Sequence, residues 1–134
     1  MVNSWNSFSE YIIKNYKDAN KIIEIAVGNY TKTAEDIEKK IKGNILLTDI
    51  KFTNNNIIDD ITNPKIELYE NADLLYSIRP PEELQPYMVK LSDKIDTDLI
   101  IKPYSSEFLN ITIRNKFKLI NYKKTSFYLK KGGK

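Results

Sequence analysis

The stretch Lys21–Tyr30, with the sequence KIIEIAVGNY, decides the fold of this 134-residue chain. Three isoleucines surround Glu24, and such a nearly continuous apolar run is typical of a strand buried on both faces of a parallel sheet. Gly28 and a polar run follow, and then a helical pattern begins. Proteins of the α/β class bind ligands at such a junction, because free backbone N–H groups and the helix dipole meet there. A plain turn, in which Gly28 only relieves backbone strain, explains the same pattern.

The composition excludes several kinds of functional site. The chain has no cysteine and no histidine, which removes thiolate metal sites, cysteine nucleophiles and the commonest general base. Its 21 basic and 18 acidic residues give a net charge of +3, which by itself is too small to indicate a nucleic-acid partner. No apolar run reaches the length of a membrane span, and the N-terminus is unlike a signal peptide. We therefore expect a soluble, cytoplasmic protein without a membrane partner.

Alternating helices and strands are predicted on both sides of the opening stretch. Phe8, Ile12 and Tyr16 lie on one helical face, which predicts an N-terminal helix over Trp5–Tyr16, within residues 1–18. The other expected elements are strands at Lys21–Val27, Asn44–Asp49, Asn56–Asp60, Ala72–Ile78 and Thr97–Lys102, helices over 33–42, 81–95 and 106–114, and a closing hairpin of Phe117–Tyr122 and Ser126–Lys130.

This pattern predicts one α/β domain over residues 1–134, with a mostly parallel sheet and an antiparallel C-terminal hairpin. Gly43 follows the helix over 33–42, where glycine commonly ends a helix at the C′ position. Residues 130–134 are rich in lysine and glycine, and we expect them to form a loose tail.

The order of these elements resembles the class I S-adenosylmethionine-dependent methyltransferases, whose three-layer, Rossmann-like fold also ends in an antiparallel hairpin. In that family the first strand ends in an acid followed by a glycine-rich turn, usually D/E-x-G-x-G-x-G. Glu24 and Gly28 match the acid and the middle glycine, whereas Ala26 and Tyr30 replace the first and third glycines. The runs DDITNP and ADLLYSIRPPEEL further resemble an uncharacterised archaeal protein family with a methyltransferase-like fold, over nearly the whole chain.

The resemblance implies an S-adenosylmethionine site at the carboxyl ends of the strands. It implies that Glu24 lies near the methionine part of the cofactor, that Asp49 holds the ribose hydroxyls, and that Asp59 or Asp60 lies near the adenine. Turn chemistry ahead of Thr62 is the alternative explanation for the last two acids. The implied cofactor-binding residues are Glu24, Ala26, Gly28, Asp49, Asp59, Asp60 and Ser77.

Arg79, Pro80 and Pro81 stand where the resembled family carries its motif after the fourth strand. The chain has only two arginines, and the Arg79 guanidinium suits a carboxylate or phosphate group of a ligand. A salt bridge to Glu82 or Glu83 is the structural alternative. Family members that methylate amines carry Asn/Asp-Pro-Pro-Tyr/Phe here, and because arginine cannot accept a hydrogen bond, we do not expect that chemistry.

Three hypotheses of function follow. The first is an S-adenosylmethionine-binding, methyltransferase-like protein with a small-molecule substrate that the sequence does not identify. The second is a catalytically degenerate domain that serves as a binding or scaffold module, which Ala26, Tyr30 and Arg79 favour. The third is nucleic-acid binding by lysines of the C-terminal hairpin, although most such lysines simply keep a sheet edge solvated. The residues behind this third hypothesis are Lys116, Lys118, Lys123, Lys124, Lys130 and Lys131, with Tyr122 and Tyr128.

Overall fold

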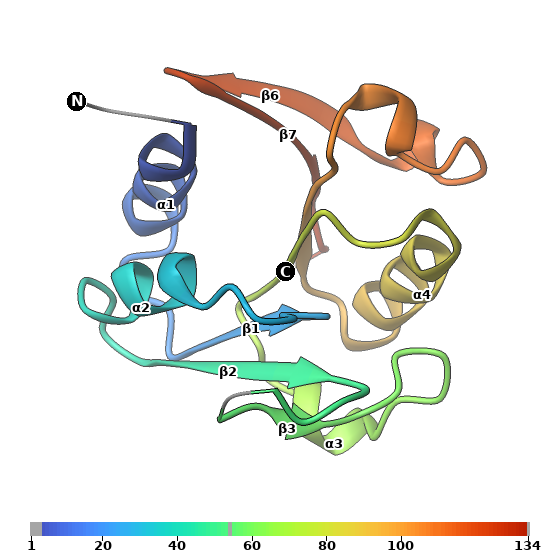
Figure 1. Cartoon of the computed structure of the whole chain (residues 1–134), viewed down its shortest axis with the longest axis horizontal. Helices are drawn as coiled ribbons and strands as arrows, with labels where there is room; N and C mark the ends of the chain where they lie inside the picture. Colours follow the sequence, from blue (N-terminus) through green and yellow to red (C-terminus); the bar gives the residue numbers. More distant parts are fainter. Residues whose placement is uncertain (1–3, 54, 134) are drawn as a thin grey trace.

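The computed structural model describes residues 4–53 and 55–133, and a single sheet lies at its centre. Its strands are β1 (Lys21–Ile25), β2 (Asn44–Asp49), β3 (Ile57–Ile58), β4 (Leu74–Ile78), β5 (Asp98–Lys102), β6 (Lys118–Tyr122) and β7 (Thr125–Lys130). Within the described residues the sheet has seven strands in the order β3-β2-β1-β4-β5-β7-β6 (Figure 1). The strands β1 to β5 run parallel, and β7 and β6 close the sheet as an antiparallel hairpin.

Helices cover both faces of the sheet and form a three-layer structure (Figure 1). They are α1 (Ser4–Asn15), α2 (Lys32–Glu38), α3 (Ile66–Tyr69) and α4 (Gln85–Ile95), with short 3-10 turns η1 (Glu82–Leu84), η2 (Ser106–Phe108) and η3 (Arg114–Lys116). The alternation of side chains along β1 divides the core, because successive residues of a strand point to opposite faces. Ile22 packs with Phe8 of α1 and Ile37 of α2, whereas Ile23 packs with Met88 of α4. The predicted α/β, Rossmann-like fold class is confirmed.

The prediction of a helix over residues 106–114 is wrong. The chain instead forms η2, a loop and η3. The Asn110 side chain accepts hydrogen bonds from the backbone amide and the hydroxyl of Thr112, a local arrangement that competes with helix formation. Arg114 donates to the carbonyl oxygens of Ser106 and Leu109 at 3.0 and 2.9 Å. These side-chain bonds satisfy the backbone of the segment in place of a helical ladder.

Gly43 has a different role from the one predicted. Helix α2 ends at Glu38, and Gly43 does not adopt the left-handed conformation of a helix-ending glycine. A Cβ atom at Gly43 would lie 2.0 Å from the backbone oxygen of Asn20. Glycine is therefore required because two backbone segments pass too closely for a side chain.

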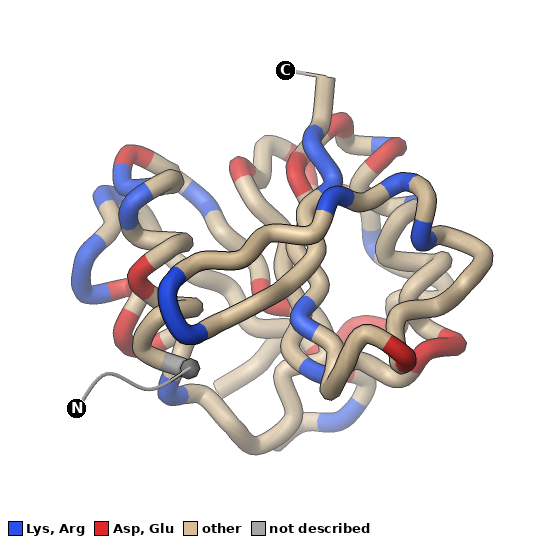
Figure 2. The backbone as a smooth tube through the Cα atoms, turned by 90° about the horizontal axis from the view of Figure 1, so that it is seen from above, with Lys and Arg blue, Asp and Glu red and all other residues tan. Residues whose placement is uncertain are grey.

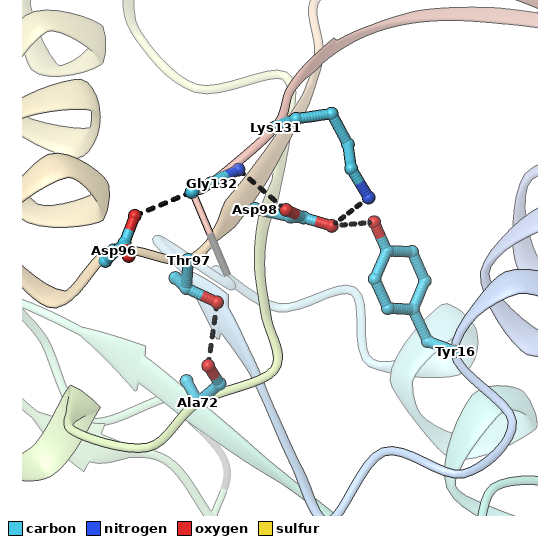
Figure 3. A network of polar contacts seen from close by, with 8 residues as sticks. Tyr16, Ala72, Asp96, Thr97, Asp98, Lys131 and Gly132 are labelled. Atoms are coloured by element: carbon cyan, nitrogen blue, oxygen red, sulfur yellow. Dashed lines mark hydrogen bonds and ion pairs between the residues drawn. The ribbon is translucent and has the colours of Figure 1, made fainter.

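The tail is held by hydrogen bonds rather than loose, as Figure 3 shows for Lys131 and Gly132, and the Gly133 amide donates to Asp96 Oδ1 at 2.6 Å. The Gly132 amide and the Lys131 ammonium donate to the Asp98 carboxylate at 2.8 and 2.9 Å. The Tyr16 hydroxyl donates to the same carboxylate at 2.7 Å, so Asp98 joins the tail to the segment after α1. Lys134 lies outside the described residues. Across the described part of the chain, no helix combines the length and the apolar character needed to cross a membrane.

Candidate functional site

The turn after β1 brings the ends of β1 and β2 together. The Gly28 amide donates to Asp49 Oδ2 at 2.9 Å, and the Thr53 hydroxyl donates to the Gly28 carbonyl oxygen at 2.7 Å. Gly28 has a φ of 62°, and a Cβ atom added there would meet no atom within 4 Å. The Cα side of Gly28 therefore faces open space, although its amide and carbonyl groups are bound to Asp49 and Thr53.

Ala26 adopts a left-handed backbone conformation, which glycine adopts more readily than alanine does. Its φ is 59°, in the left-handed region, which costs an L-residue with a Cβ atom about 1–2 kcal/mol. The turn thus keeps the glycine-type geometry of the resembled motif although the glycine itself is missing. Such strain at the end of a buried strand is typical of functional sites.

Asp49 lies where the resemblance places a ribose-binding acid. Its carboxylate accepts hydrogen bonds from the amides of Gly28 and Lys51, at 2.9 and 3.1 Å. A carboxylate has about four acceptor positions, so these two bonds orient the group and leave capacity for ligand hydroxyls.

A small, mostly apolar cavity of about 80 Å³ lies on the α3/α4 side of this turn, and we call it the β2 cavity. Its lining includes Ile50, Ile61 and Leu84, together with Asp49 and Asp60. Apolar walls beside a few fixed polar groups are typical of small-molecule sites, but such sites usually have volumes of about 300–1,000 Å³, so the β2 cavity would hold only part of a ligand.

Asp59 and Asp60 both line the β2 cavity, but they also have structural partners. The Asp59 carboxylate is buried and accepts a hydrogen bond from the Tyr69 hydroxyl at 2.6 Å. Asp60 accepts from the amide and the hydroxyl of Thr62 at 2.9 and 2.7 Å. The hydrogen bonds of the turn at Thr62 therefore explain the presence of Asp60 without a ligand. Asp59 holds α3 in place through the Tyr69 hydroxyl.

A second cavity, of about 270 Å³, lies at the ends of β1 and β4, and we call it the Glu24 cavity. It is lined by Glu24, Val27, Tyr30, Ile78 and Arg79. The Glu24 side chain is almost completely buried, and the Tyr76 hydroxyl donates to Oε1 at 2.8 Å. Burial raises the pKa of Glu24 to about 8, although the Tyr76 hydrogen bond partly opposes this rise. The carboxyl group is therefore mostly protonated at neutral pH.

Arg79 also adopts a left-handed conformation, with a φ of 51°. Its amide donates to the Lys102 carbonyl oxygen at 2.7 Å, which extends the pairing of β4 and β5 to the strand ends. The guanidinium carbon lies 4.9 Å from the ring centroid of Tyr104, within the range of a cation–π interaction. The position of Tyr104, directly after the Lys102-Pro103 strand end, already predicts from the sequence that this residue could line a pocket.

Ser77, Pro80 and Pro81 do not line either cavity. Ser77 is fully buried, and its hydroxyl donates to the Ile25 carbonyl oxygen at 2.6 Å, so it joins the ends of β1 and β4. The Pro80 carbonyl oxygen accepts from the side-chain amide of Gln85 at 3.2 Å. Gln85, which no sequence motif marked, also donates to the Phe108 carbonyl oxygen at 2.9 Å and thereby fixes the loops after β4 and β5 together.

The hairpin lysines do not form one uniform basic surface. Lys123, Lys130 and Lys131 pair with the acidic residues Glu10, Asp93 and Asp98 respectively. Figure 2 shows basic residues interspersed with acidic ones along the chain, although Lys123 and Lys124 stand together at the hairpin tip. The nucleic-acid hypothesis therefore has less support than a small-molecule site.

Two solved structures share this fold. A crystal structure of the nicotianamine synthase MtNAS in complex with MTA and tNA aligns with a TM-score of 0.61 at 14% sequence identity, covering 92% of this chain and 58% of that one. A mutant of MtNAS in complex with S-adenosylmethionine aligns with a TM-score of 0.55 at 11% identity, covering 96% and 63%. The chain thus spans less than two thirds of the neighbours' length, and at these identities the likeness shows the methyltransferase-like fold alone.

Relatives in archaea match nearly the whole chain. A UPF0146 protein of Methanothermobacter thermautotrophicus is 38% identical over 125 residues, covering 92% of each chain. One of Methanocaldococcus jannaschii is 38% identical, covering 88% of this chain and 90% of the relative, and one of Archaeoglobus fulgidus is 32% identical, covering 90% of each. Together with a family model that matches residues 5–132, these relatives show that the chain belongs to the uncharacterised protein family UPF0146.

Proposed function

We propose that this protein binds S-adenosylmethionine across the turn at Ala26–Gly28. The observation that carries the proposal is the placement of two fixed carboxyl groups, Glu24 and Asp49, beside a turn at which a side chain on Gly28 would point into open space. The β2 cavity and the Glu24 cavity both lie beside this turn. Ala26 lines the β2 cavity, and Val27 lines the Glu24 cavity. A long ligand with a flat end and a charged end matches this arrangement.

Each part of the cofactor has residues that suit it. The apolar walls formed by Ile50, Ile61 and Leu84 suit the adenine, and the remaining acceptor positions of Asp49 suit the ribose hydroxyls. Glu24 and Arg79 line the same cavity and carry the two groups that recognise an α-amino acid: a carboxyl for its ammonium and a guanidinium for its carboxylate. Once bound, S-adenosylmethionine would supply an electrophilic methyl group at its sulfonium.

Glu24 couples ligand binding to a proton. In the free protein burial keeps the carboxyl mostly neutral at pH 7, because it raises the pKa of Glu24. A ligand ammonium beside it would favour the carboxylate, so the carboxyl would release its proton, while the Tyr76 hydroxyl continues to hold Oε1. The same cavity therefore suits a cationic group better than a neutral one. The crystallised complexes of the fold neighbours with S-adenosylmethionine and MTA support the same ligand class.

A cofactor-binding module without catalysis is the second candidate. It is favoured by Arg79, which has donors only and stands where an acceptor would hold an amine substrate. The chain also has no histidine that could serve as a general base. Binding without methyl transfer to any acceptor would favour this candidate over an enzyme.

Isothermal titration calorimetry with S-adenosylmethionine and S-adenosylhomocysteine tests the proposal. We expect the wild-type protein to bind, and Gly28→Ala to weaken binding by at least about tenfold, because the added methyl group would occupy the space of the ligand. Asn71→Ala is the matched control, since Asn71 is exposed, has a φ of 67° and precedes β4 at the opposite end of the sheet. Absence of heat and of a thermal shift at millimolar ligand, or equal affinity of Gly28→Ala and wild type, would overturn it.

A further inference from the structure

A third cavity, of about 350 Å³, lies between the end of β5, the 3-10 turn η2 and strand β7. We call it the Lys102 cavity. Its lining includes Lys102, Tyr104, Ser105, Ser106, Ser126 and Tyr128, and among the described lining residues none is acidic. Its volume lies within the range of small-molecule sites in proteins, which is about 300–1,000 Å³.

This cavity is separated from the Glu24 cavity by Arg79, Lys102 and Tyr104. The Arg79 guanidinium belongs to the Glu24 cavity and stacks on the ring of Tyr104, which lines the Lys102 cavity. The Lys102 ammonium donates to the carbonyl oxygen of Ser126 at 3.1 Å, and Ser126 lines the same cavity. Two cations therefore stand at adjacent strand ends, between the two cavities.

The Lys102 ammonium is held in a partly desolvated position. It lies 6.0 Å from the ring centroid of Phe8, on α1. Burial lowers the pKa of Lys102, and the positive charge of Arg79 lowers it further. Both effects disfavour the charged lysine in the free protein, and an anion bound beside the Lys102 ammonium would offset both.

The walls of the Lys102 cavity are fixed before any ligand arrives. Gln85 binds the carbonyl oxygens of Pro80 and Phe108, and its own carbonyl accepts from the Asn110 amide at 2.8 Å. Arg114 binds the carbonyl oxygen of Ser106, which is a lining residue. A fixed wall reduces the ordering cost of binding a small ligand.

From this geometry we propose that the Lys102 cavity is the subsite for a second, small substrate that carries a phosphate or carboxylate group on a flat apolar body. The Lys102 ammonium would bind the anionic group, the hydroxyls of Ser105 and Ser106 would donate to it, and the rings of Tyr104 and Tyr128 would contact the flat part. The word substrate rests on the proposed function, because it assumes S-adenosylmethionine in the neighbouring cavity. The binding of the anion itself does not.

The test uses phenyl phosphate, benzoate and inorganic phosphate as probes, each titrated into the full chain by calorimetry at physiological salt. Lys102→Met keeps the side-chain stem and removes the charge, and we expect it to weaken phenyl phosphate binding by at least about tenfold. Tyr104→Leu is the second variant: its ring is 72% exposed, so folding should not depend on it. It should weaken phenyl phosphate more than inorganic phosphate. Lys40→Met, at an exposed lysine after α2, is the control and should bind as wild type does.

The relative affinities of phenyl phosphate and benzoate then assign the anionic group as a phosphate or a carboxylate. Failure of all three probes to bind, or equal affinities for Lys102→Met and Lys40→Met, would overturn the inference. Displacement of phenyl phosphate by an RNA oligonucleotide that binds more tightly would also overturn it, in favour of a nucleic-acid site. Probe binding in a protein that does not bind S-adenosylmethionine would leave the anion subsite standing and remove the proposed function. Binding of S-adenosylmethionine without binding of any probe would leave the proposed function standing and remove the anion subsite.

Discussion

Replacing Glu24 with glutamine should stabilise the free protein. Burial raises the pKa of Glu24 from the ordinary 4.5 to about 8, so between these values the folded protein holds one proton that the unfolded chain has released. Folding therefore takes up a proton, and the free energy of unfolding falls as the pH rises through this range. Glutamine is neutral at every pH, and its amide oxygen can still accept the hydrogen bond from the Tyr76 hydroxyl.

The size of the effect follows from the distance between pH 7 and the ordinary pKa of 4.5. Each pH unit in that interval costs about 1.4 kcal/mol, so Glu24→Gln should raise the free energy of unfolding by about 3 kcal/mol at pH 7. In a domain of this size the melting temperature should rise by roughly 10 °C. The difference should be small at pH 4.5, where half of the unfolded carboxyl groups are protonated, and should vanish below that pH, where the folded and unfolded states both hold the proton.

Urea titrations of the free protein at pH 5 and pH 8 measure this difference. Glu70→Gln is the control, because Glu70 is exposed beyond α3 and its replacement should change stability little at either pH. A stability gain equal at the two pH values, or a Glu24→Gln variant less stable than wild type at pH 8, would refute the reasoning. A gain in stability with loss of cofactor binding is the usual signature of a residue kept for function.

Three further predictions concern backbone geometry and the tail. Ala26→Gly should raise the free energy of unfolding by up to about 1 kcal/mol in urea titrations, because it relieves a φ of 59°, whereas Ala72→Gly at a buried, unstrained position should lower it. Gly43→Ala should lower it by about 3 kcal/mol or more in the same assay, because the methyl group would lie 2.0 Å from the Asn20 carbonyl oxygen, and a loss below about 1 kcal/mol would contradict this. Asp98→Asn should cost about 1–3 kcal/mol and loosen the tail, seen as faster amide hydrogen exchange, with cofactor affinity unchanged because Asp98 lies at the opposite end of the sheet. Burial would raise the pKa of Asp98, but the Gly132 amide, Lys131 and Tyr16 together lower it below the ordinary 3.8, so the stability that Asp98 provides in the wild type should be lost as the pH falls below that value.

The sheet could be predicted because its strands carry strong local signals. The apolar run at Asn44–Asp49 gives β2 with its bounds unchanged, and the short link at Lys123–Lys124 fixes the antiparallel hairpin. The strand order was not predicted, since nothing in one strand's residues states which strand lies beside it. In the structure, β1 pairs in parallel with both β2 and β4, and so it lies between them in the sheet.

The segment after β5 could not be predicted from its pattern. Phe108, Leu109 and Ile113 have helical spacing, yet Asn110 and Arg114 satisfy the backbone by side-chain bonds. Such bonds depend on where a side chain lies in three dimensions, and helical periodicity does not record them. The bonds that fix the tail to Asp98 escaped prediction for the same reason, because they join residues distant in sequence.

The candidate site was only partly visible in the sequence. Glu24, Gly28 and Asp49 stand out because acids and a glycine end buried strands, and the structure brings them to one turn. Ser77 satisfied the motif but lies buried against a backbone oxygen. Tyr104 and Gln85 carried no motif, since their roles depend on contacts between the loops after β4 and β5.

The central claim is that S-adenosylmethionine binds beside Glu24, and a proton count tests it most directly. Titration of the cofactor into the wild-type protein at pH 7, in two phosphate-free buffers with different heats of ionisation, gives the number of protons released from the difference in heat. Because the pKa of Glu24 in the free protein is about 8, we predict release of close to one proton by the wild type and none by Glu24→Gln. Binding without proton release, or no binding heat in either buffer, would contradict the account.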